Sequence, residues 1–423
     1  MSSTDRYAAA IDLGTTTIAA ALVSIPDGRC LARSGSLNPQ RSFGLDVITR
    51  LGYADQSAAN LQQLTRVINE ELCRLIADLT KTAKIAPKQM ETVAIAGNPA
   101  MSHLLMGLPV DSLVRPPFRP KVTTGHCFST KDLGWELQAQ AYVFPSPGGF
   151  VGGDTIAFLY GLGFPDPGSL LPDHAFFIDL GTNGEIALLS AGKIYAASVA
   201  AGPAFEAGNL SCGMAALPGA IDRVTAHDGR LQLRTIGGDR PVGLCGSGVL
   251  DTVALLLADG MLDKTGRLLA PEEVRTALGN RLVELESERH FLLYRDASQL
   301  VSLSQADIRQ VQLAKSAVRA GMEVLLERAG IAEGNIGEVV MTGSFGASLS
   351  LRSLKSIGVL TENMVKNARF VSDGALGGVI RFLCSAAAPD DIARLAGRLV
   401  ILPLSGTPLF ERHFMNNMDF AQQ

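Results

Sequence analysis

The chain has 423 residues, of which 47% are hydrophobic and 18% are charged, and its formal net charge is -4. This length and composition allow large buried cores and predict a globular protein of two or three domain-sized units. No dense basic run and no apolar run long enough to cross a bilayer occurs, so we expect neither a nucleic-acid partner nor a membrane partner. The first predicted strand starts near Tyr7 without a signal-peptide pattern before it, so we expect a cytoplasmic location.

The first predicted elements form a three-stranded meander. Residues 7–13 and 18–25 are apolar runs joined by the turn in IDLGTTT, and a second turn leads to a candidate strand at 30–37. Over 57–83, leucine, isoleucine and valine recur close to every 3.6 residues, which predicts an amphipathic helix. The stretch METVAIAGNPAMSHLLMG, at 90–107, predicts a strand that ends at a Gly-Asn turn before a short helix.

The same arrangement returns in the second half of the chain. A glycine-rich segment predicts a helix that begins near Asp154 and ends by Gly163, and 165–168 predicts a linker. After it, IDLGTNG at 178–184 again joins two apolar runs, and a third run follows. Because a whole supersecondary unit is repeated, the sequence predicts two α/β halves. We place these halves at residues 1–165 and 174–423.

Further elements are predicted in the second half. Asp228 and Gly229 are a strong two-residue turn signal for a hairpin. Cys245–Gly248 is a glycine-rich turn before a buried helix, and amphipathic spacing over 305–329 predicts a long helix. The next apolar run predicts a strand that ends in a Gly-Ser-Phe-Gly turn at 343–346.

The repeated turn has the parts of a polyphosphate site. Glycine lets the backbone approach a ligand, turn N–H groups and threonine hydroxyls donate to anionic oxygens, and a carboxylate can hold Mg²⁺ through water. One such turn is commonly just a hairpin, but two copies in matching contexts favour a phosphate clamp. If the halves face each other, two carboxylates flank one metal-bound triphosphate, which suits phosphoryl transfer. The predicted residues are Asp12, Gly14, Thr15, Thr16 and Thr17 in the first turn and Asp179, Gly181, Thr182, Asn183 and Gly184 in the second, with Asp12 and Asp179 holding the metal.

The order of these elements resembles the actin, heat-shock chaperone and sugar-kinase superfamily of ATPases. The resemblance implies a duplicated α/β actin-like fold, with two RNase H-like halves that close over ATP in a nucleotide cleft. It implies that Gly343, Ser344, Phe345 and Gly346 contact the adenosine, although an ordinary strand-to-helix turn is the alternative. It also makes Asp154 the candidate residue that positions the attacking water or acts as base. A helix N-cap is the competing account of Asp154, and the two roles can coexist.

One branch of the superfamily resembles the chain more closely. The strings NPQ, GLDVITRLGYA, AGNPAMSHLLMGLPV, PPFRP, FVGGDT, AAGPAFEAGN, LCGSGVLD and PLFERHFMNNMDF are similar to the ATPase portion of the reductive activators of corrinoid proteins. The likeness covers essentially the whole chain. It implies a protein that uses ATP and Mg²⁺ to drive an uphill electron transfer, which returns an inactive cob(II)alamin to cob(I). It also implies a corrinoid protein as partner, and a homodimer.

The cysteines depart from that family. Many members carry an iron–sulfur domain, whereas the six cysteines here, at 30, 73, 127, 212, 245 and 384, are scattered without a C-x-x-C pair. We therefore expect buried or half-buried thiols of a reduced compartment and no iron–sulfur cluster in this chain. Either a separate iron–sulfur protein delivers the electron, or the protein does something other than reduction.

Several residues and two other functions stay open. Glu185 is a site residue or a solvated carboxylate, and Glu206, with Gly202, belongs to the cleft or to a capped loop. Cys245–Gly248 offers either an anion-binding helix N-terminus or a structural turn. His103 and His290 are expected to be packed or surface residues. A small-molecule kinase of the same superfamily and an ATP-controlled binding or assembly module with little turnover are the alternative functions.

Overall fold

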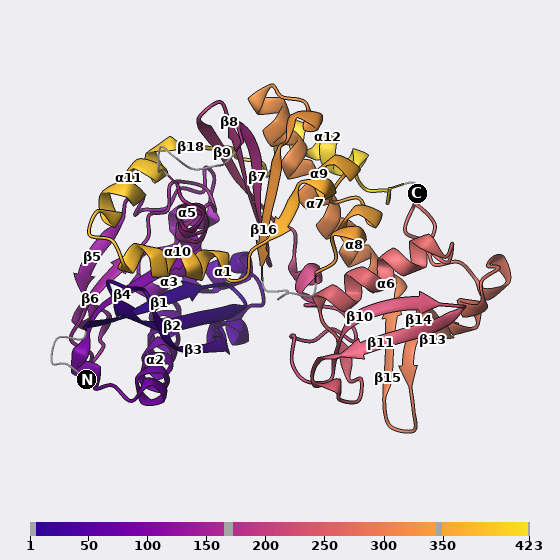
Figure 1. Ribbon diagram of the computed structural model, residues 1–423, viewed down its shortest axis with the longest axis horizontal. Coiled ribbons are helices and arrows are strands. Elements are labelled where there is room, and N and C mark those ends of the chain that lie inside the picture. Colours follow the sequence, from indigo (N-terminus) through magenta and orange to yellow (C-terminus); the bar gives the residue numbers. More distant parts are fainter. Residues whose placement is uncertain (1–5, 165–171, 344–348, 422–423) are drawn as a thin grey trace. The chain divides into compact units, whose positions relative to one another are not determined.

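The computed structural model describes residues 6–164, 172–343 and 349–421, which form two compact units (Figure 1). Each unit is assembled from segments that are distant in the sequence. Unit 1 contains 6–164, 189–197 and 373–403, and unit 2 contains 172–188, 198–343, 349–372 and 404–421. Among the helices in these ranges, none is both long enough and apolar enough to span a bilayer.

The predicted first meander is present and belongs to a six-stranded sheet with the order β3-β2-β1-β4-β6-β5. Strands β1, β2 and β3 pair antiparallel, and β4 runs parallel to β1. The sequence predicted the first four of these strands but neither β5 nor β6. The bounds are β1 Arg6–Leu13, β2 Thr17–Ile25, β3 Cys30–Leu37, β4 Met90–Gly97, β5 His126–Ser129 and β6 Gln140–Val143.

Helices cover both faces of this sheet. Figure 1 shows α2 (Ala58–Ala83) on one face and α5 with α10 on the other. Along α2, Leu64, Ile68 and Leu72 are completely buried, and each such side chain contributes about 1.5–3 kcal/mol. The predicted helix at 57–83 is therefore confirmed, with Ser57 as its N-cap. The other helices of unit 1 are η1 (3₁₀) Pro39–Phe43, α1 Val47–Asp55, η2 (3₁₀) Pro87–Gln89, α3 Pro99–Met106, α4 Asp111–Val114, η3 (3₁₀) Thr130–Leu133, α5 Gly153–Gly161, α10 Gly374–Leu383 and α11 Ala388–Arg398.

A second six-stranded sheet repeats the plan of the first, with the order β17-β16-β7-β8-β9-β18. Strand β16 runs parallel to β7, as β4 does to β1, so β9-β8-β7-β16-β17 has the order of β3-β2-β1-β4-β6. The predicted duplication is thus confirmed. The bounds are β7 His174–Leu180, β8 Gly184–Ser190, β9 Lys193–Val199, β16 Glu338–Gly343, β17 Ala368–Phe370 and β18 Leu399–Ile401.

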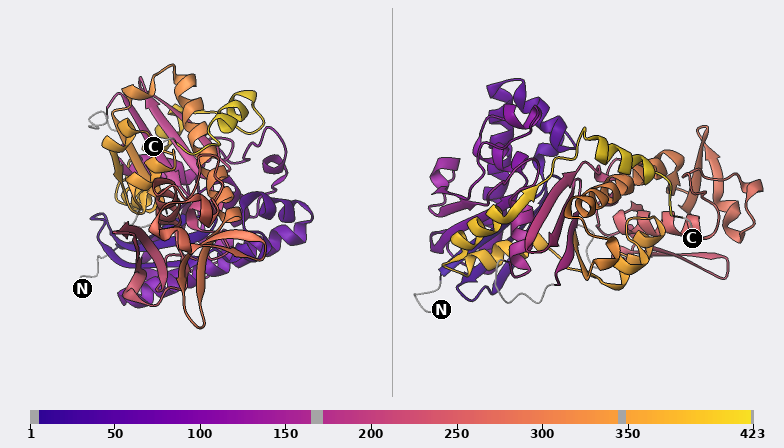
Figure 2. Two further views of the ribbon diagram at one scale, coloured as in Figure 1. Left: turned by 90° about the vertical axis from the view of Figure 1, so that its right-hand side faces the viewer. Right: turned by 90° about the horizontal axis from the view of Figure 1, so that it is seen from above.

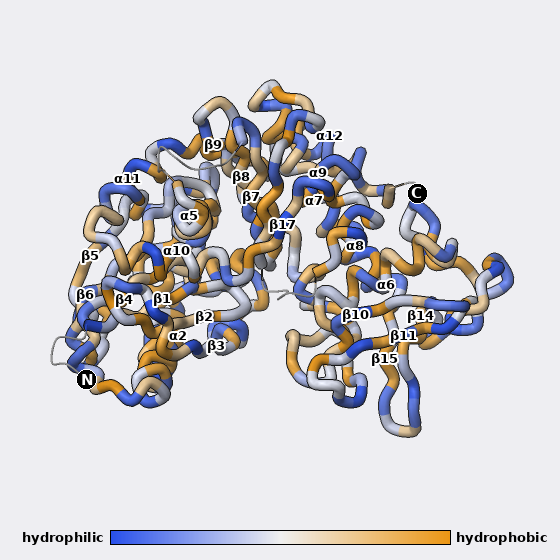
Figure 3. The backbone as a smooth tube through the Cα atoms, viewed as in Figure 1, coloured by the Kyte–Doolittle hydropathy of each residue, from blue (hydrophilic) through white to orange (hydrophobic). Residues whose placement is uncertain are grey.

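Figure 3 shows hydrophobic residues concentrated in β7, where Phe176, Phe177 and Ile178 are at most 1% exposed. The predicted hairpin at Asp228 and Gly229 joins β10 to β11, and both turn residues have positive φ. Helix α7 has the predicted bounds. The remaining elements of unit 2 are η4 (3₁₀) Pro203–Glu206, β10 Ala220–His227, β11 Arg230–Thr235, η5 (3₁₀) Ile236–Gly238, β12 Gly243–Leu244, α6 Gly246–Ala258, η6 (3₁₀) Pro271–Glu273, η7 (3₁₀) Ala277–Arg281, β13 Leu282–Leu285, β14 Glu288–Arg295, β15 Leu300–Ser304, α7 Gln305–Ala329, η8 (3₁₀) Glu333–Asn335, α8 Leu351–Ser356, α9 Glu362–Lys366 and α12 Pro408–Asn416.

The end of the described chain is fixed to unit 2 by charged side chains. Figure 2 shows α12 running beside α7. His413 of α12 lies between two carboxylates of α7, with Nδ1 2.8 Å from Glu323 and Nε2 2.9 Å from Glu327. The amphipathic spacing over 305–329 predicted α7 but not this contact.

Candidate functional site

The turn between β1 and β2 lies at the carboxyl end of β1. The half-buried Asp12 has alanines beside it on both neighbouring strands, Ala19 on β2 and Ala96 on β4. Gly14 is sterically required, because a Cβ atom there would lie 2.4 Å from the carbonyl oxygen of Thr17. The sequence therefore places a carboxylate with small neighbours directly before a tight, hydroxyl-bearing turn.

The three threonines of this turn have different surroundings. Thr15 is only 7% exposed and its Oγ1 accepts a hydrogen bond of 2.9 Å from the Asn98 amide. Thr16 is half-buried, and its carbonyl accepts from the N–H of Asn38 at 2.9 Å. Thr17 is exposed at the start of β2. Asn38 and Asn98 were not predicted as site residues, although each stands in an Asn-Pro pair that could have marked them.

Asp154 stands at the start of α5 in the same unit. Gly152 is the N-cap, without a side-chain hydrogen bond, so the competing account of Asp154 as a helix N-cap is wrong. Asp154 instead lies in the first turn and accepts from the N–H of Thr155 at 2.7 Å. Burial raises the pKa of the Asp154 carboxyl to about 6, against the effect of that hydrogen bond. A carboxylate with this pKa can accept a proton near neutral pH.

Glycines let α5 approach the first turn closely. A Cβ atom on Gly152 would lie 2.5 Å from the Cα atom of Asn98, and one on Gly97 would lie 2.7 Å from the carbonyl oxygen of Leu13. The end of β1, the end of β4 and the start of α5 therefore meet within unit 1. This is the edge where α/β sheets commonly bind ligands, outside the carboxyl ends of parallel strands.

The turn between β7 and β8 has carboxylates around it. Asp179 is half-buried and lies in register with Thr342 of β16. Thr182 is buried, and its hydroxyl donates to Glu206 Oε2 at 2.5 Å. The structure thus brings Glu206, left open by the sequence, to this turn.

The glycines of the second turn make a backbone hydrogen bond and permit close packing. The N–H of Gly181 donates to the carbonyl of Asn183 at 3.1 Å. Gly184 permits close packing, because a Cβ atom there would lie 2.8 Å from Cγ2 of Val199. Glu185 accepts a hydrogen bond of 3.2 Å from Ser198 and is half-buried.

The predicted adenosine turn is described only at its first residue. Gly343 ends β16 with φ 141° and pairs with Leu180 of β7. Ser344, Phe345 and Gly346 lie outside the described residues. The predicted contact of this turn with adenosine therefore stays a prediction.

The other candidates have structural roles. At the start of α6, the hydroxyl of Ser247 donates to the Asp222 carbonyl at 2.9 Å, and a Cβ atom on Gly248 would lie 2.2 Å from the Ile221 carbonyl oxygen. His103 is buried, with Nδ1 3.0 Å from the Pro109 carbonyl and Nε2 accepting from the Lys121 N–H at 3.1 Å. Burial lowers the pKa of His103. The Cys245–Gly248 turn and His103 are therefore accounted for by packing and hydrogen bonds.

All six cysteines are free thiols. Cys30 and Cys127 are exposed, so the expectation of buried or half-buried thiols is wrong for these two, which stand on β3 and on the edge strand β5. Within residues 6–164, 172–343 and 349–421, no group of three or more His, Cys, Asp or Glu side chains is arranged to hold a metal ion. Magnesium bound through a carboxylate, waters and nucleotide phosphates does not need such a group.

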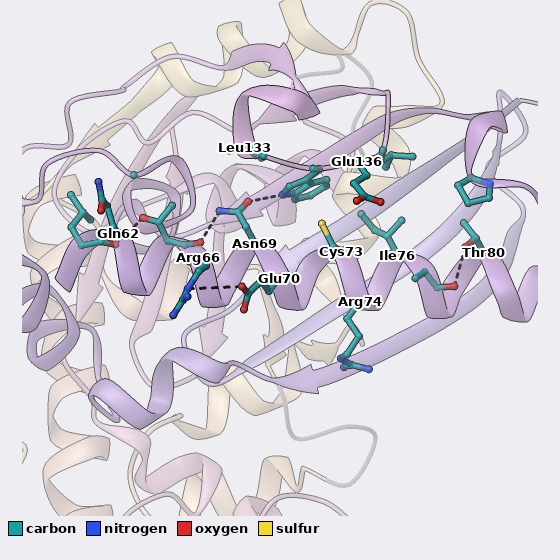
Figure 4. A pocket seen from close by; sticks show the side chains of 18 of the residues that line it. Gln62, Arg66, Asn69, Glu70, Cys73, Arg74, Ile76, Thr80, Leu133 and Glu136 are labelled. Atoms are coloured by element: carbon teal, nitrogen blue, oxygen red, sulfur yellow. Dashed lines mark hydrogen bonds and ion pairs between the residues drawn. The ribbon is translucent and has the colours of Figure 1, made fainter. Parts of the chain in front are cut away.

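A groove of about 1150 Å³ runs along α2 in unit 1 (Figure 4). Trp135, the only tryptophan in the sequence, lines this groove and donates from Nε1 to Asn69 Oδ1 at 2.7 Å. Burial, together with Glu136 and Glu70, raises the pKa of the Cys73 thiol to about 11, which keeps it protonated. No residue of either turn lines this groove.

Two family models match the chain. The model of the RACo middle region matches residues 7–166, and the model of the C-terminal domain of RACo, the ASKHA domain, matches residues 173–423. The chain belongs to the RACo family. An ASKHA domain has the actin-like ATPase fold, so the predicted fold class is confirmed, and the domain type implies nucleotide binding.

Individual RACo relatives agree with this assignment. The chain is 32% identical to the corrinoid activation enzyme RamQ of Eubacterium limosum, over 98% of this chain and 70% of the relative. It is 21% identical to a [Co(II) methylated amine-specific corrinoid protein] reductase of Methanosarcina barkeri, over 99% of this chain and 77% of that protein. A solved structure of a reductive activator for corrinoid, iron-sulfur protein superposes with a TM-score of 0.89 at 29% identity, covering 99% of this chain and 67% of that one.

Proposed function

We propose that the protein is an ATP-dependent activator that supports the reductive reactivation of a corrinoid protein. The observation that carries this proposal is the match of both RACo models, together with 32% identity to a corrinoid activation enzyme over 98% of the chain. The same resemblance was found from the sequence strings alone.

The repeated turns are the nucleotide-binding segments that we propose. Residues 14–17 of unit 1 would bind phosphate through backbone N–H groups and hydroxyls, and residues 181–184 of unit 2 would offer the corresponding groups. Asp12 and Asp179 would hold Mg²⁺ through water, and Gly343–Gly346 would contact the adenosine. Hydroxyls, turn amides and isolated carboxylates are the donor set that a magnesium–triphosphate requires, so these residues fit the ligand.

Asp154 would act as the base or orient the attacking water. Its raised pKa, about 6, suits that role, because the carboxylate is ionised at neutral pH and still accepts a proton. When bound, Mg²⁺ and ATP would supply a hydrolysable phosphoanhydride and neutralise its charge.

ATP turnover would change how the protein binds its corrinoid partner. Moving a partner from 1:99 to 99:1 between two states requires about 5.5 kcal/mol of differential binding. We propose that this energy favours a cob(II) state that is easier to reduce. The electron would come from a separate iron–sulfur protein. A homodimer and a cytoplasmic location are further parts of the proposal.

The test combines the protein, Mg-ATP, a reductant with an iron–sulfur protein, and the cognate corrinoid protein, and follows the cobalt spectrum. We expect conversion of cob(II) to cob(I) that depends on this protein and on ATP, and an ATPase rate that the corrinoid protein raises. An ATPase rate and a cobalt spectrum that are indifferent to every cognate corrinoid protein would overturn the proposal. ADP formation that instead requires a small-molecule acceptor would favour the kinase alternative.

A further inference from the structure

Two asparagines hold the polar acceptors of the first turn. The Asn38 amide donates to the carbonyl of Gly14 at 2.9 Å, and the Asn38 N–H donates to the carbonyl of Thr16 at 2.9 Å. The Asn98 amide donates to Oγ1 of Thr15 at 2.9 Å. Both asparagines are nearly inaccessible, at 1% and 4% exposure. Three acceptors of the turn at 14–17 are therefore bound by these two buried residues.

These contacts decide which way the donors of the turn point. A peptide group is planar and trans, so its N–H points opposite to its carbonyl. With the Gly14 and Thr16 carbonyls directed to Asn38, the N–H groups of Thr15 and Thr17 point away from Asn38. Because Oγ1 of Thr15 accepts from Asn98, its own hydroxyl proton is directed elsewhere. These acceptors are thus bound by buried asparagines, while the N–H groups of Thr15 and Thr17 point away from Asn38 and are the donors that a phosphate would use.

Each of the two asparagines is itself held in place by a helix cap. Each precedes a proline and caps a helix: Asn38 caps η1, with Oδ1 accepting from Gln40 N–H at 3.0 Å, and Asn98 caps α3, with Oδ1 accepting from Met101 N–H at 3.0 Å. Since the cap uses the amide oxygen, the NH₂ group is the part that faces the turn. Each asparagine side chain therefore caps a helix through its oxygen and contacts the turn through its NH₂ group.

Asn98 also touches the helix that carries Asp154. Its Cα atom would lie 2.5 Å from a Cβ atom on Gly152, the N-cap of α5, so the two backbones pack without an intervening side chain. The same residue therefore sets the place of the Thr15 hydroxyl and adjoins the start of α5.

We propose that Asn38 and Asn98 are positioning residues that orient the first turn for nucleotide phosphate. This inference rests on the proposed function, because it assumes that the turn binds ATP. Neither residue contacts the phosphate itself. Each acts through the peptide groups and the hydroxyl that it holds.

Asparagine-to-aspartate substitutions test this role with the helix caps retained. Aspartate is as good an N-cap as asparagine, but in Asn38→Asp a carboxylate oxygen would face the Gly14 carbonyl and repel it. In Asn98→Asp the carboxylate would draw the Thr15 hydroxyl proton toward itself. We expect each variant to weaken binding of Mg-AMPPNP about 10- to 100-fold in calorimetry.

The matched control is Asn69→Asp. Asn69 is also a buried asparagine of unit 1, and its amide donates to the carbonyls of Thr65 and Leu105 at 2.8 and 3.0 Å rather than to the turn. We expect it to lower the melting temperature while nucleotide affinity stays within about 2-fold of wild type, since only the turn variants misorient the donors. If an aspartate variant does not fold, Asn38→Ser or Asn98→Ser keeps a capping oxygen and removes the amide NH₂ group that reaches the turn.

The outcomes separate this inference from the proposed function. Wild type that binds Mg-AMPPNP, with turn variants that bind as tightly as Asn69→Asp, would overturn the positioning role alone. Wild type that binds no nucleotide would overturn the proposed nucleotide site, and the positioning role with it. A selective loss of affinity in the turn variants, larger than the control shows at equal loss of stability, would establish the role.

Discussion

The two repeated turns have nearly the same sequence but opposite surroundings. Around the β1–β2 turn, the neighbouring side chains are donors, the amides of Asn38 and Asn98, and they bind the turn's acceptors. Around the β7–β8 turn, the neighbouring side chain is an acceptor, Glu206, and it binds the proton of Thr182. The same strand–turn–strand unit is therefore held through its acceptors in unit 1 and through a hydroxyl proton in unit 2.

This difference assigns the two turns different parts in the proposed site. A turn whose acceptors are held by the protein offers donors, which suit phosphate oxygens. A turn whose hydroxyl proton is taken by a carboxylate offers oxygen acceptors, and with Asp179 nearby in the chain these suit magnesium-bound water. We therefore expect changes at Asn38, Asn98 or Asp154 to affect phosphate binding or hydrolysis, and a change at Glu206 to affect the magnesium requirement.

The largest expected effect is on turnover, in Asp154→Asn. Asparagine keeps an acceptor for the Thr155 N–H but cannot take a proton, so we expect kcat for ATP hydrolysis to fall about 10²- to 10⁴-fold with nucleotide affinity little changed. In wild type, the rate should rise as pH increases through about 6, because the carboxylate is the active form. A pH–rate profile of both proteins checks this.

The same variant should lose activity but gain stability. Burial raises the pKa of Asp154 from 3.8 to about 6, so the ionised carboxylate destabilises the fold at higher pH. Asp154→Asn should therefore be more stable than wild type by about 1–3 kcal/mol above pH 6, and the difference should shrink as pH falls toward 4.

Asp390→Asn, at an exposed first-turn acid of α11, is the control and should change neither the ATPase rate nor the stability. An unchanged ATPase rate in Asp154→Asn would remove this residue from the mechanism.

Gly14 and Gly181, the first residues after β1 and β7, differ in the space around them. A Cβ atom on Gly14 would lie 2.4 Å from the Thr17 carbonyl oxygen, whereas one on Gly181 would lie 3.4 Å from that of Asn183, and neither glycine has a positive φ. We expect Gly14→Ala to lower the free energy of unfolding by about 1–3 kcal/mol and Gly181→Ala by less than about 1 kcal/mol. Urea unfolding measures both. Equal losses in the two variants would mean that the turns are not packed as described.

Much of the fold could be predicted because its elements carry local signals. The helix at 57–83 has a continuous apolar stripe, and the hairpin at Asp228 and Gly229 has turn residues that accept positive φ. The duplication was readable because both turns keep Asp, Gly and Thr in the same order. The sequence did not predict strands β5 and β6 or the return of residues 373–403 to unit 1. Short strands and returning segments depend on tertiary contacts, which sequence periodicity does not record.

The candidate site was only partly predictable for the same reason. The turn residues themselves carry the signal, and Asp154 was found from its place after two glycines. Asn38 and Asn98 lie 24 and 83 positions from the residues that they hold, so nothing local links them to the turn. Glu206 was left open because its role appears only when η4 is folded against Thr182.

The smallest expected effect concerns the second turn, in Glu206→Gln. Glutamine keeps an oxygen that accepts the Thr182 proton at the same place, so the fold and the hydrogen bond should persist while the negative charge is lost. If carboxylates near this turn hold magnesium-bound water, the Mg²⁺ concentration for half-maximal ATPase activity should rise about 3- to 10-fold. A magnesium titration at saturating ATP measures this change.

Glu185→Gln is the matched control, because Glu185 lies on the same hairpin and accepts from Ser198 rather than from the turn. It removes the same charge from a neighbouring carboxylate, so a purely long-range electrostatic effect would appear in both variants and would fall with ionic strength. A higher magnesium requirement in Glu206→Gln alone would place the effect at the Thr182 contact. If Asn98→Asp raised the magnesium requirement as much as Glu206→Gln did, the division between a donor-presenting turn and a carboxylate-bearing turn would be wrong.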